Sequence, residues 1–139
     1  MFDHGMLLPI IALVGWTFVM WVWMYATRIP ALQKERVDLV ALSRTGAPLV
    51  LPPEVARVSD NYNHLHEQPT IFYATALVAQ LAGAMDVFTV ALGWAYVALR
   101  IVHSLVQATR NVIQLRFAVF TLGSLVLLAI WLRTLLRLV

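Results

Sequence analysis

Long stretches without a charged side chain are the feature of this sequence that most restricts its fold. Four stretches of 16 to 23 residues contain, among them, a single Asp, Glu, Lys or Arg, which is Arg100. A helix that crosses the hydrocarbon core of a bilayer needs about 20 mostly apolar residues. The sequence therefore predicts four membrane-spanning helices, at about residues 6–27, 68–85, 87–109 and 115–135.

The overall composition agrees with a chain whose solvent is lipid. Of the 139 residues, 61% are hydrophobic and 12% are charged, whereas a soluble domain has about 45–50% apolar and about 25% charged residues. This argues against a soluble enzyme and against a nucleic-acid-binding module. The absence of cysteine excludes disulfides, thiolate metal sites and a cysteine nucleophile. We predict one all-α domain, 1–139, that forms an integral membrane four-helix bundle.

Basic residues indicate the orientation of the predicted bundle. Seven of the ten lie in or beside the connections between spans one and two and between spans three and four. Basic connections usually face the cytoplasm, so both termini are expected outside it. Arg133 and Arg137 near the C-terminus do not fit this pattern. The start lacks the basic region of a signal peptide, so the first span is expected to be retained.

Prolines predict where the first two helices begin and end. Pro30 is expected to end the first helix, and residues 32–43 to add a further helical turn or two at the membrane interface. Pro52 and Pro53 are followed by Glu54, a pattern typical of a helix start. Nothing clearly stops a helix between there and Gly83, and Pro69 is expected to kink it. Helix two is thus predicted to extend from about residue 53 on the cytoplasmic side.

Arg100 is the charged residue deep inside a predicted span, where an arginine costs about 2.5–3.5 kcal/mol even on a lenient scale. Arg116 and Arg133 lie at the ends of the fourth span, where their side chains can reach the headgroups. Arg100 needs an anionic partner or a water-filled cavity. Polar residues three, seven and eleven positions later continue its helical face: His103, Gln107 and Asn111. The head of helix two carries a matching stripe of Asp60, Asn63, Glu67 and Thr70, bordered by His66 and Tyr73.

The two polar stripes are expected to face each other or a neighbouring subunit, because lipid would penalise both. Glu67 is the first candidate for the partner of Arg100, and Asp60 is the second. Two interpretations stay open at this point. The pair fixes the register of two helices, or Arg100 belongs to a cationic pocket that opens to the cytoplasm.

Metal binding is not expected. His64 and His66 are two residues apart, so on a helix they point to different faces. No pair of histidines has the four-residue spacing of a helical metal motif. The sequence also contains no phosphate-binding glycine loop and no nucleophile elbow.

Two segments carry a resemblance to a known family. Residues 63–72 read NHLHEQPTIF, and residues 100–107 read RIVHSLVQ and are followed by Arg116. The first is similar to an Asn, acid, Pro and Phe series at the head of helix two. The second is similar to a third-helix Arg and His followed by a basic residue that opens helix four. With its size and four spans, the chain resembles a divergent, bacterial-type member of the MAPEG family, the membrane-associated proteins of eicosanoid and glutathione metabolism.

The resemblance implies a homotrimer in the bacterial inner membrane, in contact with lipid. In the family's enzymes, glutathione sits between subunits near the cytoplasmic side, and a lipophilic small molecule approaches through the bilayer. A cysteine-free protein that carries out thiol chemistry must obtain its thiol from such a ligand. Arg116 would be the catalytic residue, because a guanidinium stabilises a thiolate. The residues implied in binding glutathione are Asn63, His66, Glu67, Arg100, His103 and Gln107.

Three positions depart from the pattern of glutathione-using members. Ser59 replaces an arginine, His66 replaces an acid that is displaced by one residue to Glu67, and Gln107 replaces a common tyrosine. Two hypotheses follow: a glutathione-dependent transferase or peroxidase, or a non-catalytic MAPEG-fold protein that binds lipid or a partner membrane protein. A small multidrug exporter is a weaker third hypothesis because no carboxylate lies in mid-span. No nucleic-acid partner is expected.

Overall fold

Helices account for most of the computed structural model, which describes residues 4–139. The described part of the chain contains no strand, which confirms the predicted all-α class. The six helices in this range are α1 (Leu7–Lys34), α2 (Leu39–Thr45), α3 (Pro53–His64), α4 (Gln68–Leu81), α5 (Val87–Ala108) and α6 (Ile113–Leu138).

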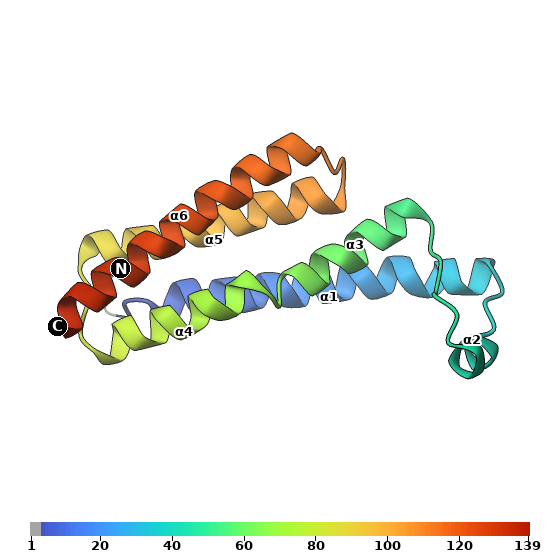
Figure 1. Cartoon of the computed structure of the whole chain (residues 1–139), viewed down its shortest axis with the longest axis horizontal. Helices are drawn as coiled ribbons and strands as arrows, with labels where there is room; N and C mark the ends of the chain where they lie inside the picture. The colour runs from blue at the N-terminus through green and yellow to red at the C-terminus, as the bar shows by residue number, and fades with distance from the viewer. Residues whose placement is uncertain (1–3) are drawn as a thin grey trace.

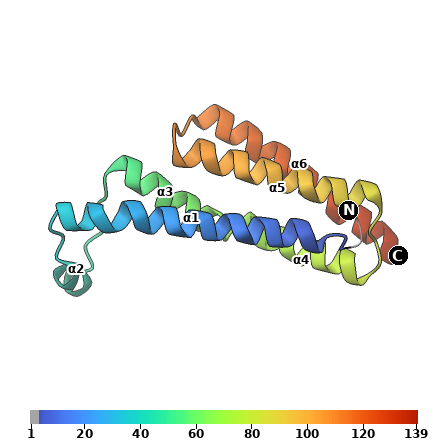
Figure 2. The same ribbon diagram turned by 180° about the vertical axis from the view of Figure 1, so that it is seen from behind.

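The helices lie side by side in an elongated molecule (Figure 1). α3 and α4 follow one another end to end along α1, and α5 packs antiparallel to α6. The view from behind shows the α5–α6 pair lying beside α1, which it contacts through α5 (Figure 2). Both termini lie at one end, and α2 lies at the other. The side of a membrane that each end faces stays a prediction.

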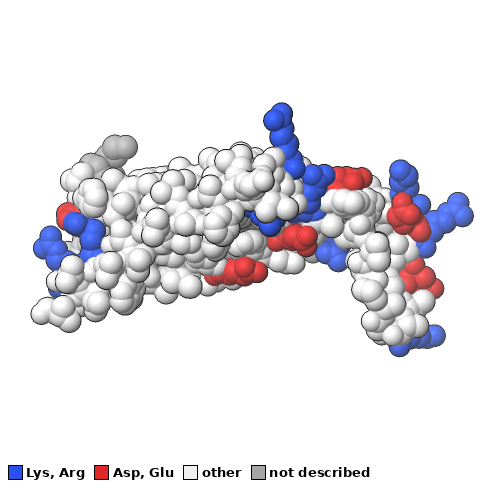
Figure 3. Space-filling model, turned by 45° about the horizontal axis from the view of Figure 1, so that its top comes forward, with Lys and Arg blue, Asp and Glu red and all other residues white. Residues whose placement is uncertain are grey.

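Three helices are long and apolar enough to cross a membrane: α1, α5 and α6, with 28, 22 and 26 residues. The predicted span at 68–85 corresponds to α4, which has 14 residues and is shorter than the about 20 that a span requires. The passage of this segment through the membrane stays a prediction. Figure 3 shows an uncharged belt between the charged cluster near the termini and the other charged groups.

Apolar packing inside the subunit leaves large apolar side chains outside it. Leu13, Phe72 and Tyr96 are fully buried, and the rings of Phe72 and Tyr96 stack with centroids 4.5 Å apart. In contrast, Phe18 is 63% exposed and Phe117 is 71% exposed. Such surfaces are rare on soluble monomers and suit contact with lipid or with another subunit.

The prediction of a continuous second helix is wrong, because α3 ends at His64 and α4 begins at Gln68. Pro69 lacks an N–H, and in a continuous helix its ring would meet the carbonyl of Leu65 four residues earlier. The chain instead leaves the helical conformation at Glu67, whose φ is −95° and ψ is −101°. This break frees the His64 carbonyl from its usual helical partner.

The prediction that Pro30 ends the first helix is also wrong, since α1 continues to Lys34. A proline removes one backbone hydrogen bond, whereas the next turn still closes because Glu35 N donates to Ala31 O at 3.0 Å. The further helical turns expected at 32–43 correspond in part to α2. Asp38 begins this helix by accepting hydrogen bonds from the backbone of its first turn.

Asp86 joins α5 and α6 at the end of the molecule that holds the termini. Its Oδ1 caps α5 by accepting from Thr89 N at 2.7 Å, and its Oδ2 pairs with Arg133. Arg137 lies 3.7 Å from the same oxygen. The hydrogen bonds from Thr89, together with the charge of Arg133, lower the pKa of Asp86 from its ordinary value. Arg133 and Arg137, which do not fit the charge pattern used to predict the orientation, thus share Asp86 as a carboxylate partner.

Replacement of Asp86 by asparagine is expected to lower the thermal unfolding temperature at neutral pH. Asparagine still caps α5 but carries no charge for Arg133 and Arg137. Because folding lowers the pKa of Asp86, its carboxylate stabilises fully above the ordinary value of 3.8, and this stabilisation is lost as the pH falls through the folded value. Thermal melts in detergent should therefore separate the two proteins at about pH 7 and converge at low pH. Equal melts at neutral pH would contradict the ion-pair role.

Candidate functional site

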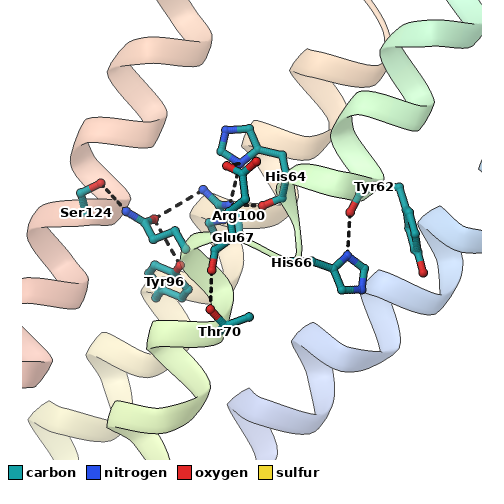
Figure 4. A network of polar contacts seen from close by, with 9 residues as sticks. Tyr62, His64, His66, Glu67, Thr70, Tyr96, Arg100 and Ser124 are labelled. Carbon is teal, nitrogen blue, oxygen red and sulfur yellow. Dashed lines mark hydrogen bonds and ion pairs between the residues drawn. The ribbon is translucent and has the colours of Figure 1, made fainter. Parts of the chain in front are cut away.

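Arg100 lies on the buried side of α5 and is 1% exposed. Its Nη2 donates to the carbonyl oxygen of His64 at 3.3 Å and lies 3.5 Å from His64 Nδ1. Its Nη1 lies 3.5 Å from Gln68 Oε1 (Figure 4). Within residues 4–139, its Nε is buried without a hydrogen-bond partner. Within the described chain, the guanidinium therefore contacts a carbonyl, an imidazole and an amide, and it keeps an unused donor.

The predicted ion pair of Arg100 with Glu67 or Asp60 is wrong, because the described residues form neither pair. Glu67 Oε2 lies 3.5 Å from His64 Nδ1 instead, and its side chain is 68% exposed. Asp60 is exposed on α3. The break before Pro69 turns this part of the stripe away from the direction that a continuous helix would give it. The interpretation in which an ion pair of Arg100 fixes the register of two helices therefore lacks a carboxylate partner for Arg100 among the described residues.

Gln68 connects three helices at the level of Arg100. Its Oε1 accepts from Tyr96 Oη at 3.2 Å, in addition to its contact with Arg100. Its Nε2 donates to Ser124 Oγ at 2.7 Å, and Ser124 Oγ donates in turn to the backbone of α6. Gln68 thereby holds the first turn of α4 against α5 and α6, which fixes the position of the Arg100 guanidinium.

A cavity of about 200 Å³ opens beside this network, between the end of α3, α5 and the start of α6. His103 contributes from α5 and is 3% exposed. The rings of His64 and His103 meet edge to face with centroids 5.1 Å apart. The side chains that line the cavity are His64, His103, Ile113, Arg116, Phe117 and Phe120.

Arg116 is held at the cavity by the turn between α5 and α6. Asn111 has a φ of 50°, a left-handed conformation that Asn tolerates better than most residues. Its Oδ1 accepts from Arg116 Nη1 at 2.7 Å. Arg116 is half-buried, so a guanidinium with a fixed direction lines the same cavity as two imidazoles.

The sequence matches the MAPEG family over residues 6–136, nearly its whole length. The chain belongs to the MAPEG family. The curated proteins and the solved structures compared with it gave no match. Family membership, together with the apolar helices α1, α5 and α6, makes this MAPEG protein an integral membrane protein.

Of the other residues implied in glutathione binding, Asn63 and His66 do not line the cavity with Arg116. Asn63 is exposed on α3. His66 Nδ1 lies 2.9 Å from the Tyr62 carbonyl, and His66 lines a separate cavity of about 220 Å³ between α1 and the α3–α4 junction. In the single subunit of this MAPEG protein, the predicted set is therefore divided between two faces.

Two departures from the family pattern occupy buried positions. Gln107 is 5% exposed and Ser59 is 6% exposed. Within the described chain, Gln107 Oε1 and Ser59 Oγ are buried without a hydrogen-bond partner. Nearby along the same helices, Asn61 Nδ2 donates to Ser104 Oγ. The polar face predicted on α5 is thus buried at Arg100, His103 and Gln107, and part of it has no partner within the subunit.

Two residues of this MAPEG site, Gln68 and His64, do not stand out in the sequence as site residues. Gln68 directly precedes Pro69. Because proline favours the first turn of a helix, this pattern could have predicted that Gln68 lies at the start of a new helix. His64 was considered only as a metal ligand. Its place beside Arg100 depends on the break between α3 and α4, which helical spacing does not reveal.

Proposed function

We propose that this MAPEG protein is a glutathione-dependent transferase or peroxidase that acts on lipophilic substrates. One observation carries the proposal: Arg116 and two imidazoles line one cavity, next to a buried Arg100 that contacts neutral groups. Two guanidinium groups at one end of the polar network favour a ligand with negative charges. Glutathione is such a ligand, since it carries two carboxylates and a thiol.

The size of the cavity indicates which part of glutathione it would take. About 200 Å³ is less than the about 300–1,000 Å³ of sites for drug-sized ligands. This space suits the thiol-bearing residue of the tripeptide, with Arg116 beside the sulfur. An opposite charge within about 4–6 Å favours the ionised thiol. Arg100 is suited to a carboxylate, because guanidinium groups form bidentate contacts with carboxylates.

The proposed chemistry requires no thiol from the protein. The thiolate sulfur attacks an electrophilic carbon, the S–C bond forms, and the bond to the leaving group breaks with its electron pair. In the peroxidase reaction, two glutathione molecules are oxidised to the disulfide, and a lipid hydroperoxide is reduced to an alcohol and water. The exposed apolar helix faces suit a reactive lipophile that arrives through the bilayer.

A homotrimer would complete the site. Asn63 and His66 are exposed and do not line the Arg116 cavity of their own subunit, so they are available to the cavity of a neighbouring copy. Glu67, being largely exposed, is available in the same way to the amino group of the ligand. We place this assembly in the bacterial inner membrane, with the α2 end in the cytoplasm and both termini outside.

Binding of glutathione is the first expected result. Protein extracted in mild detergent should give a saturable heat signal in isothermal titration at no more than about millimolar ligand. Binding should also raise the ultraviolet absorbance of the thiolate at a pH where free glutathione is mostly protonated. S-methylglutathione is the matched control, because it retains the carboxylates but has no ionisable sulfur.

Two outcomes separate the parts of this proposal. Binding of both ligands, with a thiolate signal from glutathione alone, would support the proposed chemistry. If neither glutathione nor S-methylglutathione gives a heat signal, the glutathione-dependent function is rejected. Turnover of an aryl halide or a lipid hydroperoxide should then be measured on the same preparation.

The second candidate is a non-catalytic MAPEG-fold protein that binds lipid or a partner membrane protein. The observation that favours it is the separate cavity at His66, which is lined mainly by apolar and aromatic side chains. His66 stands where glutathione-using members carry an acid. Native mass spectrometry after gentle extraction distinguishes the two functions, because this candidate requires a lipid or protein that stays bound when glutathione is absent.

A further inference from the structure

His64 occupies a position that neither the ion-pair pattern nor the family resemblance assigned to it. It is the last residue of α3, immediately before the break that precedes α4. Its Nδ1 lies 3.5 Å from Glu67 Oε2 and 3.5 Å from Arg100 Nη2. One ring nitrogen thus contacts both a carboxylate and a guanidinium.

The other ring nitrogen is directed elsewhere. The two nitrogens of an imidazole lie on different sides of the ring, and Figure 4 shows His64 Nε2 pointing away from Arg100 and Glu67. The ring lines the cavity that contains Arg116. It meets the rings of His103 and Phe120 edge to face, with centroids 5.1 Å and 5.6 Å away. These contacts on several sides fix the plane of the ring.

A carboxylate on one imidazole nitrogen and a reacting group on the other is the arrangement by which enzymes orient a histidine base. We propose that His64 is the general base that removes the proton from the thiol of glutathione, and that Glu67 is its positioning residue. This proposal rests on the proposed function, because it takes glutathione as the thiol. It adds a catalytic residue to a site in which Arg116 alone was expected to favour the thiolate.

The proposed step moves one proton from the sulfur of glutathione to His64 Nε2. The base is the tautomer in which Nδ1–H points to Glu67 Oε2 and Nε2 carries the lone pair, so that Arg100 Nη2 donates to the His64 carbonyl and not to Nδ1. The S–H bond breaks, the N–H bond forms at Nε2, and the imidazolium is paired with the Glu67 carboxylate. After the sulfur attacks the electrophile, Nε2–H returns its proton to the leaving group.

Four ionisable side chains lie around His64. Arg100 and His103 face it from α5, Arg116 shares its cavity from α6, and Glu67 follows it along the chain. Among these neighbours Glu67 is the carboxylate, and it would pair with the positive charge that His64 gains when the proton moves.

His103 is the other imidazole in the cavity, and its surroundings are less suited to this role. In the described chain, no carboxylate lies within ion-pair distance of His103. It is also 3% exposed, and its neighbours are Arg100 and the rings of His64 and Phe120. His64 has both a carboxylate partner and a position at the end of a helix.

The decisive experiment measures the ionisation of bound glutathione by thiolate absorbance across pH, independently of turnover. The variant is His64→Asn, whose side chain places a polar atom near the position of Nδ1 and so keeps a contact for Arg100, but has no titrating nitrogen. The midpoint of thiolate formation is expected to rise by about one pH unit toward that of a free thiol. Turnover at neutral pH is expected to fall about tenfold, less than the about 10²- to 10⁴-fold typical of general-base effects, because Arg116 remains.

Further variants separate a chemical role from a structural one. Glu67→Gln should move the midpoint in the same direction by a smaller amount, and added imidazole should partly restore turnover to His64→Ala. His4→Asn, at the opposite end of the molecule, should leave the midpoint unchanged. His64→Gln provides a second substitution if His64→Asn fails to fold.

The results also distinguish this inference from the proposed function. Failure of the wild-type protein to bind glutathione would overturn both. Normal binding with an unchanged ionisation midpoint in His64→Asn would overturn the role of His64 alone. A midpoint that moves in His103→Asn but not in His64→Asn would assign the base to His103 and would likewise overturn the inference.

Discussion

Replacement of Arg116 by glutamine is expected to reduce glutathione transfer by about 10²- to 10³-fold, the effect typical of losing one donor that stabilises developing charge. Asn111 Oδ1 fixes Arg116 Nη1 at 2.7 Å, so the guanidinium is oriented before any ligand arrives. Glutamine retains a polar group but has no charge to favour a thiolate. The measurements are steady-state transfer to an aryl halide in detergent and the pH midpoint of bound thiolate, which should rise.

A neighbouring arginine provides the control for this substitution. Arg110 lies in the same α5–α6 turn and is exposed, so Arg110→Gln removes one positive charge from the same end of the molecule without altering the cavity. Its transfer rate should stay near that of the wild type. Arg116→Lys should retain part of the activity, because the charge remains but the planar donor does not. Equal loss in Arg110→Gln and Arg116→Gln would indicate a general effect of surface charge and would reject the specific role.

The sequence was most informative where one physical requirement dominates. Uncharged stretches of the length of a membrane span predicted α1, α5 and α6, because lipid strongly penalises charged side chains. The same penalty identified Arg100, and the structure buries it on α5 as the pattern indicated. These predictions depend on the periodicity of a single helix, which the sequence displays directly.

Predictions that depended on two helices meeting were less successful. The pairing of Arg100 with Glu67 assumed that the helix continues through Pro69, whereas the chain leaves the helical conformation at Glu67. A rotation of about 100° per residue makes the direction of each side chain near the break sensitive to its geometry. His64 gained its contact with Arg100 from this same break.

Partners far apart in the sequence could not be recognised from spacing. Asp86 and Arg133 are 47 residues apart, and Gln68 and Ser124 are 56 residues apart. Many uncharged polar residues offer equivalent donors and acceptors, so the sequence does not select Ser124 as the partner of Gln68. Only the packing of α4 and α5 against α6 makes that choice.

Replacement of Arg100 by methionine is expected to weaken glutathione binding by about 10- to 100-fold while the protein stays folded. The loss corresponds to the about 1.5–3 kcal/mol of a hydrogen bond to a charged group. Stability should change little, because no carboxylate within residues 4–139 contacts the guanidinium and would be left unpaired. Gln68 Oε1 would still accept from Tyr96 Oη, and the His64 carbonyl would still accept from Glu67 N. Isothermal titration and thermal melts in detergent measure the two effects separately.

Arg133→Met supplies the opposite pattern as a control. Arg133 pairs with Asp86 at the far end of the molecule, so its loss should lower the unfolding temperature and leave glutathione affinity unchanged. The fall in unfolding temperature of Arg133→Met gives the limit that Arg100→Met must not approach. If Arg100→Met unfolds the protein or dissociates its oligomer on native gels, Arg100 is a structural residue. If Arg100→Met binds glutathione as tightly as the wild type, the anion that Arg100 accommodates is not glutathione.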